Sequence, residues 1–258
     1  MSKRDIGERL TAEVTGSWQK CLAEKDILRM GNKMSYIYAM SDIHGCLDAF
    51  EYALSLVDFS GDNKLIFLGD YIHGPDSYGV LKKVRQLQNR YGSDKVMALL
   101  GNHEEMACDG RCSIGVNSDA GTYVRSEDDA GYLMWMRKLP RYYVEGNTIF
   151  VHAGIEEDAE DLWEWGTGDH IFTEKYPAQT GRFFGSMKIV AGHIGTAEIS
   201  GNPDFHDIYF DGESHYYIDG TVLESGIIPV IKVDTESDRY YRVTETGSWL
   251  ILPYDEER

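Results

Sequence analysis

From residue 35 onward, hydrophobic and polar positions follow two alternating patterns. Short apolar runs at residues 36–40, 64–69 and 95–100 have the length and composition of buried strands. Between these runs, residues 47–57 and 78–91 carry apolar side chains at helical spacing, and residues 104–107 begin another helix. This β-α-β-α-β order predicts an α/β fold with a mainly parallel sheet covered by helices.

The second half of the chain is richer in strands. Residues 109–131 are rich in Gly, Ser and Asp, which predicts a long loop or lid, and residues 131–139 have the pattern of a helix that ends at Pro140. Eight short runs follow, many of them aromatic or β-branched: 141–146, 147–154, 187–193, 207–211, 215–220, 226–234, 239–245 and 248–253. They predict a second, β-rich layer.

The first 33 residues differ from the rest. They are polar, with scattered apolar positions such as Ile6, Leu10, Val14 and Trp18, which favours one or two helices. Met34 opens the stretch MSYIYAMSDIHG, which is typical of a domain start. We therefore expect a helical extension of unknown role over residues 1–33 and a single domain over residues 34–258.

Charge and cysteine content narrow the possible functions. The 258 residues carry a formal net charge of -18, which disfavours binding to nucleic-acid backbones. Four irregularly spaced cysteines favour reduced thiols, because Cys108 and Cys112 have no second Cys/His pair with which to form a zinc site. The chain has neither an apolar run of membrane-spanning length nor a signal-peptide core, so we expect a cytoplasmic protein without membrane partners.

Clusters of Asp, Asn, His and Gly follow five of the predicted strands. The clusters read SDIHG (41–45), GD (69–70), GNHE (101–104), VHAG (151–154) and AGH (191–193). In open α/β sheets, ligands bind beyond the carboxyl ends of strands, so these clusters are expected to converge on one site. The glycines allow sharp turns and a close approach of the backbone to a ligand.

The residue types in these clusters favour a metal centre. Carboxylate, amide and imidazole groups together suit zinc, iron or manganese. Asp70 lies centrally in the order and is the natural bridge between two such ions, which could activate a water and clamp an in-line phosphoryl displacement. Each residue alone has a simpler explanation, since Asp70 or Asn102 could be a turn residue and His152 or His193 a hydrogen-bonded histidine. Only the combination, in a chain with eight histidines, favours the metal centre.

The ordered motifs SDIHG, LGDYIHGPDS, LLGNHEE, FVHAGI and AGHIGT resemble the calcineurin-like metallophosphoesterase superfamily, and within it the serine/threonine protein phosphatase branch. That branch also includes bacterial and phage phosphatases and symmetrical diadenosine tetraphosphate hydrolases. The likeness covers roughly Met34 to Val233. It implies a four-layer α/β/β/α sandwich with two divalent metal ions, which would be manganese, iron or zinc.

The resemblance also implies roles for individual residues. One ion would be held by Asp42, His44 and Asp70, and the other by Asp70, Asn102, His152 and His193. His103 would be the general acid for the leaving alkoxide, a role that imidazole can fill near neutral pH.

The sequence departs from the family at two phosphate-binding positions. The family usually reads G-D-x-x-D-R-G-x-x-S, whereas this chain is one residue shorter and has His73 in place of Asp-Arg. In the family this aspartate normally orients the acid histidine, and the arginine normally binds a phosphate oxygen. A second family arginine, near a tryptophan after the His-Ala-Gly motif, has no counterpart in residues 161–166. His73 could take over a catalytic role beside His103 or could be an ordinary turn residue. Arg111, Arg125 or Arg182 could enter the site from loops, although exposed arginines are common.

We therefore expect a metal-dependent phosphoric ester hydrolase in which a hydroxide bound by two metal ions attacks phosphorus. A phosphomonoesterase acting on a phosphoprotein or a small phosphoester is the first hypothesis. The altered arginine positions keep open a phosphodiesterase or a dinucleoside polyphosphate hydrolase. They also keep open a non-enzyme, a pseudo-phosphatase that binds metal and serves as a binding module, although the intact His103 argues against it.

Overall fold

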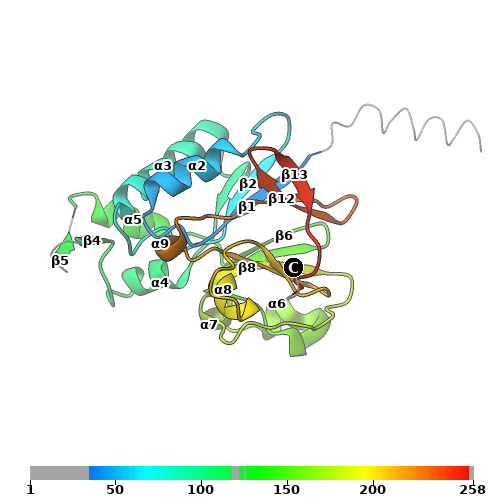
Figure 1. Cartoon of the computed structure of the whole chain (residues 1–258). Helices are drawn as coiled ribbons and strands as arrows, with labels where there is room; N and C mark the ends of the chain where they lie inside the picture. Colours follow the sequence, from blue (N-terminus) through cyan, green and yellow to red (C-terminus); the bar gives the residue numbers. More distant parts are fainter. Residues whose placement is uncertain (1–34, 118–121, 125, 256–258) are drawn as a thin grey trace, which may run out of the picture. The chain divides into compact units, whose positions relative to one another are not determined.

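The computed structural model describes residues 35–117, 122–124 and 126–255, so the extension predicted for residues 1–33 lies outside the described residues. Two sheets form the centre of the described fold (Figure 1). The first has the order β13-β12-β11-β1-β2-β3 and the second the order β6-β7-β8-β10-β9. A separate hairpin, β4 (Gly115–Asn117) and β5 (Thr122–Val124), lies within the predicted loop.

The first sheet combines a parallel half with an antiparallel half. Its parallel strands are β1 (Ile37–Met40), β2 (Lys64–Phe67) and β3 (Val96–Ala98). Its antiparallel strands are β11 (Ile231–Asp234), β12 (Arg239–Thr244) and β13 (Gly247–Leu250). The run predicted as a strand from residue 226 forms strand β11 only from Ile231, preceded by Val230, whose carbonyl oxygen accepts from Val243 N–H; Pro229 has no N–H to donate to a neighbouring strand.

The second sheet has a parallel centre and two antiparallel edges. Strands β7 (Thr148–Val151), β8 (Lys188–Gly195) and β10 (His215–Asp219) are parallel. Strands β6 (Tyr142–Glu145) and β9 (Tyr209–Phe210) flank them. The carboxyl ends of the parallel strands of both sheets are therefore available for a common site.

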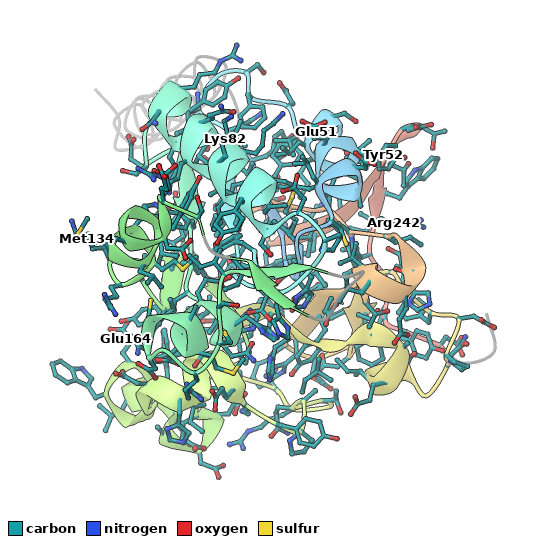
Figure 2. All side chains as sticks on the ribbon, turned by 90° about the vertical axis from the view of Figure 1, so that its left-hand side faces the viewer. Glu51, Tyr52, Lys82, Met134, Glu164 and Arg242 are labelled. Atoms are coloured by element: carbon teal, nitrogen blue, oxygen red, sulfur yellow. The ribbon has the colours of Figure 1, made fainter. Side chains whose placement is uncertain are left out.

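Helices cover the outer face of each sheet (Figure 1). The first sheet is covered by α2 (Leu47–Ser55), α3 (Ser77–Tyr91) and α5 (Asp129–Met136), and α4 (Asn102–Cys108) follows β3. The outer face of the second sheet carries the 3₁₀ helix η1 (Glu157–Leu162) and helices α6 (Trp163–Gly166), α7 (Asp169–Glu174) and α8 (Thr196–Ser200). The short helix α9 (Val222–Ser225) follows β10. Exposed residues such as Glu51, Tyr52 and Lys82 point away from this packing (Figure 2).

Three hydrophobic layers fill the spaces between these elements. Along β1, Tyr38 and Met40 face the helices while Ile37 and Ala39 face the second sheet. Strand β7 repeats this alternation, since Phe150 packs between the sheets and Ile149 and Val151 pack under the outer helices. Such two-sided burial explains why these strands are almost continuously apolar in sequence. The predicted α/β class and the four-layer α/β/β/α arrangement are confirmed.

The helices and strands predicted before residue 108 agree closely with the structure. The helix predicted at residues 131–139 instead spans Asp129–Met136. Within the described residues, no helix has both the length and the apolar character required to cross a membrane.

The layer between the sheets yields a stability prediction. Phe150 is fully buried there, so Phe150→Ala should lower the free energy of unfolding by about 3–5 kcal/mol through lost burial and a cavity. Leu250 lies on the exposed strand β13 at 56% relative exposure, so Leu250→Ala is the matched control and should change it by less than about 1 kcal/mol. Urea denaturation measures both values, and equal effects would contradict the assigned core.

Candidate metal centre

Asp70 lies at the centre of the predicted cluster. It follows β2, is 2% exposed, and its carboxylate is surrounded by histidine rings. Its Oδ2 lies 3.7 Å from His44 Nε2 and 3.7 Å from His103 Nε2. Its Oδ1 lies 3.5 Å from His152 Nε2. Each oxygen of the carboxylate therefore faces at least one imidazole nitrogen that could bind a metal ion together with it.

Two overlapping groups of residues could each hold a metal ion. One consists of His44, Asp70 and His103, and the other of Asp70, His152 and His193, with the ligand atoms of each group within 4.8 Å of one another. Asp42 adjoins the first group, since its Oδ1 lies 3.9 Å from His44 Nε2. Asp70 is common to both groups, which is the position that a bridging ligand requires.

The Asn102 amide provides a test of whether a cation fits. With its oxygen toward the cluster, that oxygen lies 3.0 Å from His152 Nε2. With its nitrogen there instead, the amide donates to Asp70 Oδ1 and Oδ2 at 3.1 and 3.0 Å. The first orientation brings the amide oxygen against the carboxylate oxygens, which repel it unless a cation lies between them. The donor set of carboxylate, amide and imidazole therefore fits a divalent metal ion.

The backbone at the strand ends is held in an uncommon conformation. Asp42, His44, Asp70, His73 and His193 all have positive φ angles, between 44° and 76°. Residues other than glycine seldom adopt this region, and such strain persists where the surrounding structure holds it in place. These turns allow side chains from consecutive loops to point toward one location.

Glu104 holds the Asp70 loop. It is fully buried on α4, and its Oε1 accepts hydrogen bonds from the backbone N–H groups of Tyr71 and Ile72 at 2.8 and 3.2 Å. Its Oε2 accepts from the N–H groups of Asp70 and Gly101 at 2.8 and 3.1 Å. One buried carboxylate thus fixes the loop after β2 to the loop after β3.

Close backbone approach explains two of the glycines. A Cβ atom at Gly101 would lie 2.2 Å from Asp70 Oδ1, and one at Gly192 would lie 2.1 Å from Asp42 Oδ2. The same loops donate to these carboxylates, since His103 N–H donates to Asp70 Oδ1 at 3.1 Å and His193 N–H donates to Asp42 Oδ2 at 3.0 Å. A side chain at either glycine would displace a candidate ligand.

The electrostatics favour a bound cation. Burial raises the pKa of Asp42 to about 6 and raises the pKa of Asp70 strongly, and repulsion from Glu104 adds to both. Burial lowers the pKa values of His44, His152 and His193, so these rings are neutral and able to act as ligands. The site thus brings carboxylates together without a compensating charge, and metal ions would supply it.

His73 lies directly beside His103. The two rings stack with their centroids 4.5 Å apart and their planes at 24°. The buried Nδ1 of His103 has no hydrogen-bond partner among the described residues, and no carboxylate takes the place of the family aspartate there. Burial, followed by the nearby rings of His44 and His73, lowers the pKa of His103 to about 3.

The arginines considered as replacements are engaged elsewhere or not described. Arg111 pairs with Asp109 at 3.3 Å, and Arg182 pairs with Asp158 at 2.6 Å. Arg125 lies outside the described residues. In the arginine-free segment, Trp163 packs into the core of the second sheet's outer layer.

Two residues of the site were missed by the sequence analysis. Glu104 was included in the GNHE cluster and in the helix predicted from residue 104, but no role in the site was given to it. Asp219 ends β10, is 6% exposed, and interacts electrostatically with Asp42 and His44. The sequence does contain a signal for Asp219, because HYYIDG has an apolar strand followed by an acidic residue and a glycine, as the other motifs do.

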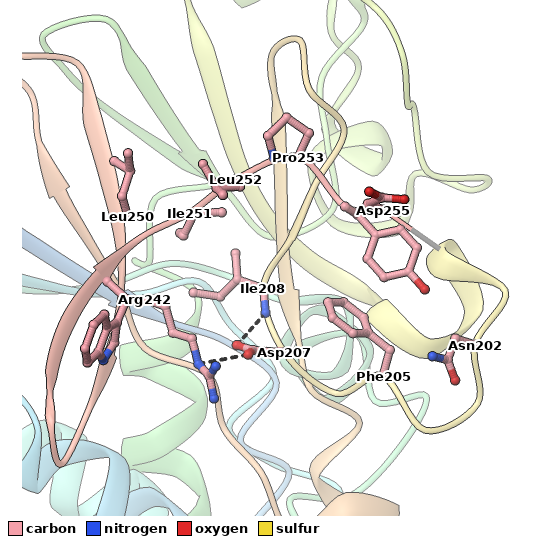
Figure 3. Close-up of a pocket in the computed structure, with 12 residues that line it drawn as sticks. Asn202, Phe205, Asp207, Ile208, Arg242, Leu250, Ile251, Leu252, Pro253 and Asp255 are labelled. Atoms are coloured by element: carbon pink, nitrogen blue, oxygen red, sulfur yellow. Dashed lines mark hydrogen bonds and ion pairs between the residues drawn. The ribbon is translucent and has the colours of Figure 1, made fainter. Parts of the chain in front are cut away.

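Two surface cavities lie outside the candidate ligands. One of about 600 Å³ is lined by residues close in sequence to His44, including Gly45, Cys46 and Pro75, but by none of the candidate ligands. Another of about 480 Å³ lies by the C-terminal strands, next to the Asp207–Arg242 ion pair and to Leu250 (Figure 3). It contains none of the candidate ligands.

The role of Glu104 yields a second prediction. In Glu104→Gln the amide nitrogen must face backbone N–H groups, so the free energy of unfolding of the metal-free protein should fall by about 2 kcal/mol. The control Glu51→Gln removes an exposed ion pair with Lys83 and should change it by less than about 1 kcal/mol. Urea denaturation in EDTA compares the two variants, and similar small losses would show that Glu104 does not hold the loop.

Comparison with known proteins places this chain in a family. Residues 35–225 match the family model described as calcineurin-like phosphoesterase. Symmetrical bis(5'-nucleosyl)-tetraphosphatase of Nitrosospira multiformis is 32% identical over 124 residues, which are 46% of this chain and 43% of the relative. The enzyme of the same name from Wigglesworthia glossinidia brevipalpis is 30% identical over 145 residues, 54% of this chain and 49% of the relative. The chain thus spans about half the length of the curated relatives or less.

Solved structures share the fold at low sequence identity. A mutant cold-active protein tyrosine phosphatase has a TM-score of 0.60 at 16% identity, with 86% of this chain and 83% of that chain covered. A protein serine/threonine phosphatase from Saccharomyces cerevisiae has a TM-score of 0.51 at 14% identity, covering 86% and 82%. These likenesses agree with the layered sheets described above. On the family match and the shared fold, the chain belongs to the calcineurin-like phosphoesterase family.

Proposed function

We propose that this chain is a metal-dependent phosphoric ester hydrolase with two divalent ions at the strand ends. Asp42, His44 and Asp70 would hold one ion. The other would be held by Asp70, Asn102, His152 and His193. The observation that carries the proposal is the position of Asp70, whose two carboxylate oxygens face different histidines at 3.5–3.7 Å.

The chemistry of such a site follows from the ions and the residues around them. Bound divalent ions would activate water at neutral pH and offset the negative charge of the reacting phosphoryl group. The protein's contribution is to fix ligands in advance through Glu104 and the turns with positive φ angles. Manganese is the metal that we would test first.

His103 is proposed to donate a proton to the leaving oxygen. Its Nε2 faces Asp70 Oδ2 at 3.7 Å, so the ring lies at the edge of the metal cluster. In the absence of substrate the ring is neutral at pH 7, because its pKa lies at about 3. The negative charge of a bound phosphate would raise that pKa and favour the protonated ring. His73, stacked on His103, is proposed to hold the ring in place where the family uses a carboxylate.

A phosphomonoester, either a phosphoprotein or a small molecule, is the first substrate class. Dinucleoside tetraphosphates are the second, favoured by the name of the curated relatives. The cavity of about 600 Å³ that Gly45 and Pro75 line is proposed as the place where the group attached to phosphorus would lie. A manganese-supplemented panel of an aryl phosphomonoester, an aryl phosphodiester and diadenosine tetraphosphate would distinguish these classes. Metal binding without turnover of any of them would favour the binding module instead.

The role of His103 yields a third prediction. His103→Asn should lower kcat for an alkyl phosphomonoester by about 10²–10⁴-fold, because a general acid contributes on that order. Metal content should stay at the wild-type value, which inductively coupled plasma mass spectrometry measures. His170→Asn, outside the cluster, is the control. A variant of His103 with wild-type kcat and full metal content would exclude it as the acid.

The bridging role of Asp70 yields a fourth prediction. Asp70→Asn should lose both ions after dialysis against metal-free buffer, since the carboxylate serves both positions. His44→Asn should weaken only one, because His44 belongs to one group. Elemental analysis per mole of folded protein gives the two stoichiometries. Two ions retained by the Asp70 variant would contradict bridging.

A further inference from the structure

A carboxylate outside the proposed ligand set lies at the same site. Asp219 is the last residue of β10, which is parallel to β8 and pairs with it. Asp219 lies opposite Gly195 in this pairing, two residues beyond His193. At 6% exposure its charge is largely removed from water. Burying a charge in this way is costly unless an opposite charge is close.

The segment around Asp219 is held firmly. The backbone N–H of Thr221 donates to Asp219 Oδ1 at 2.7 Å, and the Thr196 hydroxyl donates to the Asp219 carbonyl oxygen at 3.1 Å. Thr221 has a φ of 50°, and its hydroxyl lies 2.8 Å from His206 Nδ1. A Cβ at Gly220 would lie 2.5 Å from the Ile227 carbonyl oxygen, so the chain is closely packed there. The position of the carboxylate is therefore built into the fold.

The strand pairing places Asp219 beside the proposed metal centre, because His193, two residues before its partner Gly195, donates its N–H to Asp42 Oδ2 at 3.0 Å. Burial raises the pKa of Asp219 to about 7, and the negative charge of Asp42 raises it further, while the positive form of His44 would lower it. Among the described residues, the cation-forming groups that act on Asp219 in this way are His44 and His206. No lysine or arginine ion pair with Asp219 occurs within the described part of the chain.

We propose that Asp219 is a positioning residue for the ion held by Asp42 and His44, which it stabilises through its charge without being a ligand. The inference rests on the proposed two-metal centre. Asp42, Asp70, Glu104 and Asp219 together carry up to four negative charges when ionised. Asp219 thus adds to the negative charge that attracts the divalent ions to the buried site. Residues that support metal ligands in this way change metal affinity about 10–100-fold.

The test is the affinity of the whole chain for Mn²⁺ in Asp219→Asn, which keeps the shape and the acceptor for Thr221 N–H but removes the charge. Titration calorimetry should show one of the two binding steps weakened about 10-fold and the other little changed. Asp234→Asn is the matched control, since Asp234 is also 6% exposed but ends β11 beside the start of β1, away from the site. Its Mn²⁺ affinities should equal those of the wild type.

Each outcome decides the proposal. If the wild type binds two ions and both Mn²⁺ binding steps have wild-type affinities in Asp219→Asn, the proposed role of Asp219 is overturned and the metal centre is left intact. A wild type that binds no Mn²⁺ would overturn the metal centre and this inference together. If Asp219→Asn does not fold, Asp219→Ser supplies a smaller neutral side chain that keeps a hydroxyl acceptor. Unchanged affinities in that variant would equally overturn the proposal.

Discussion

The site depends on one buried carboxylate that is surrounded by neutral imidazoles. Asp70 is 2% exposed, and its nearest partners are histidines whose pKa values are lowered by burial, so that they carry no compensating positive charge. An ionised carboxylate in such surroundings is unfavourable unless cations join it. The fold nevertheless holds Asp70 in place, through Glu104 and a strained turn. The metal-free protein is therefore locally destabilised at Asp70, in an arrangement that two divalent ions would stabilise.

The remaining architecture serves to bring distant loops to this carboxylate. The parallel strands of both sheets are apolar on both faces, and residues that follow β1 and β7 meet at Asp70 after β2. Each strand end can then contribute a ligand without a long loop, which keeps the ligands on rigid elements. Glycines at positions 101 and 192 allow neighbouring loops to approach the carboxylates to hydrogen-bonding distance. The fold and the site are thus consequences of the same arrangement of strands.

Much of this arrangement could be predicted from the sequence, because the information is local. Apolar runs such as KLIFLG identify buried strands, and the Asp, Asn and His residues after them identify the site. The support from Glu104 could not be predicted in this way, because its four partners come from loops separated in sequence. Likewise, the stacking of His73 on His103 depends on a turn geometry that the shortened motif does not specify. The start of β11 was misplaced because a proline lies within an otherwise strand-like run.

The central claim is that one aspartate joins two metal ions. The most direct measurement is a crystal grown with Mn²⁺, with diffraction data collected on both sides of the manganese absorption edge. We predict two anomalous peaks about 3.5–4 Å apart on either side of the Asp70 carboxylate. A single peak, or two peaks of which only one lies within coordinating distance of Asp70, would contradict it.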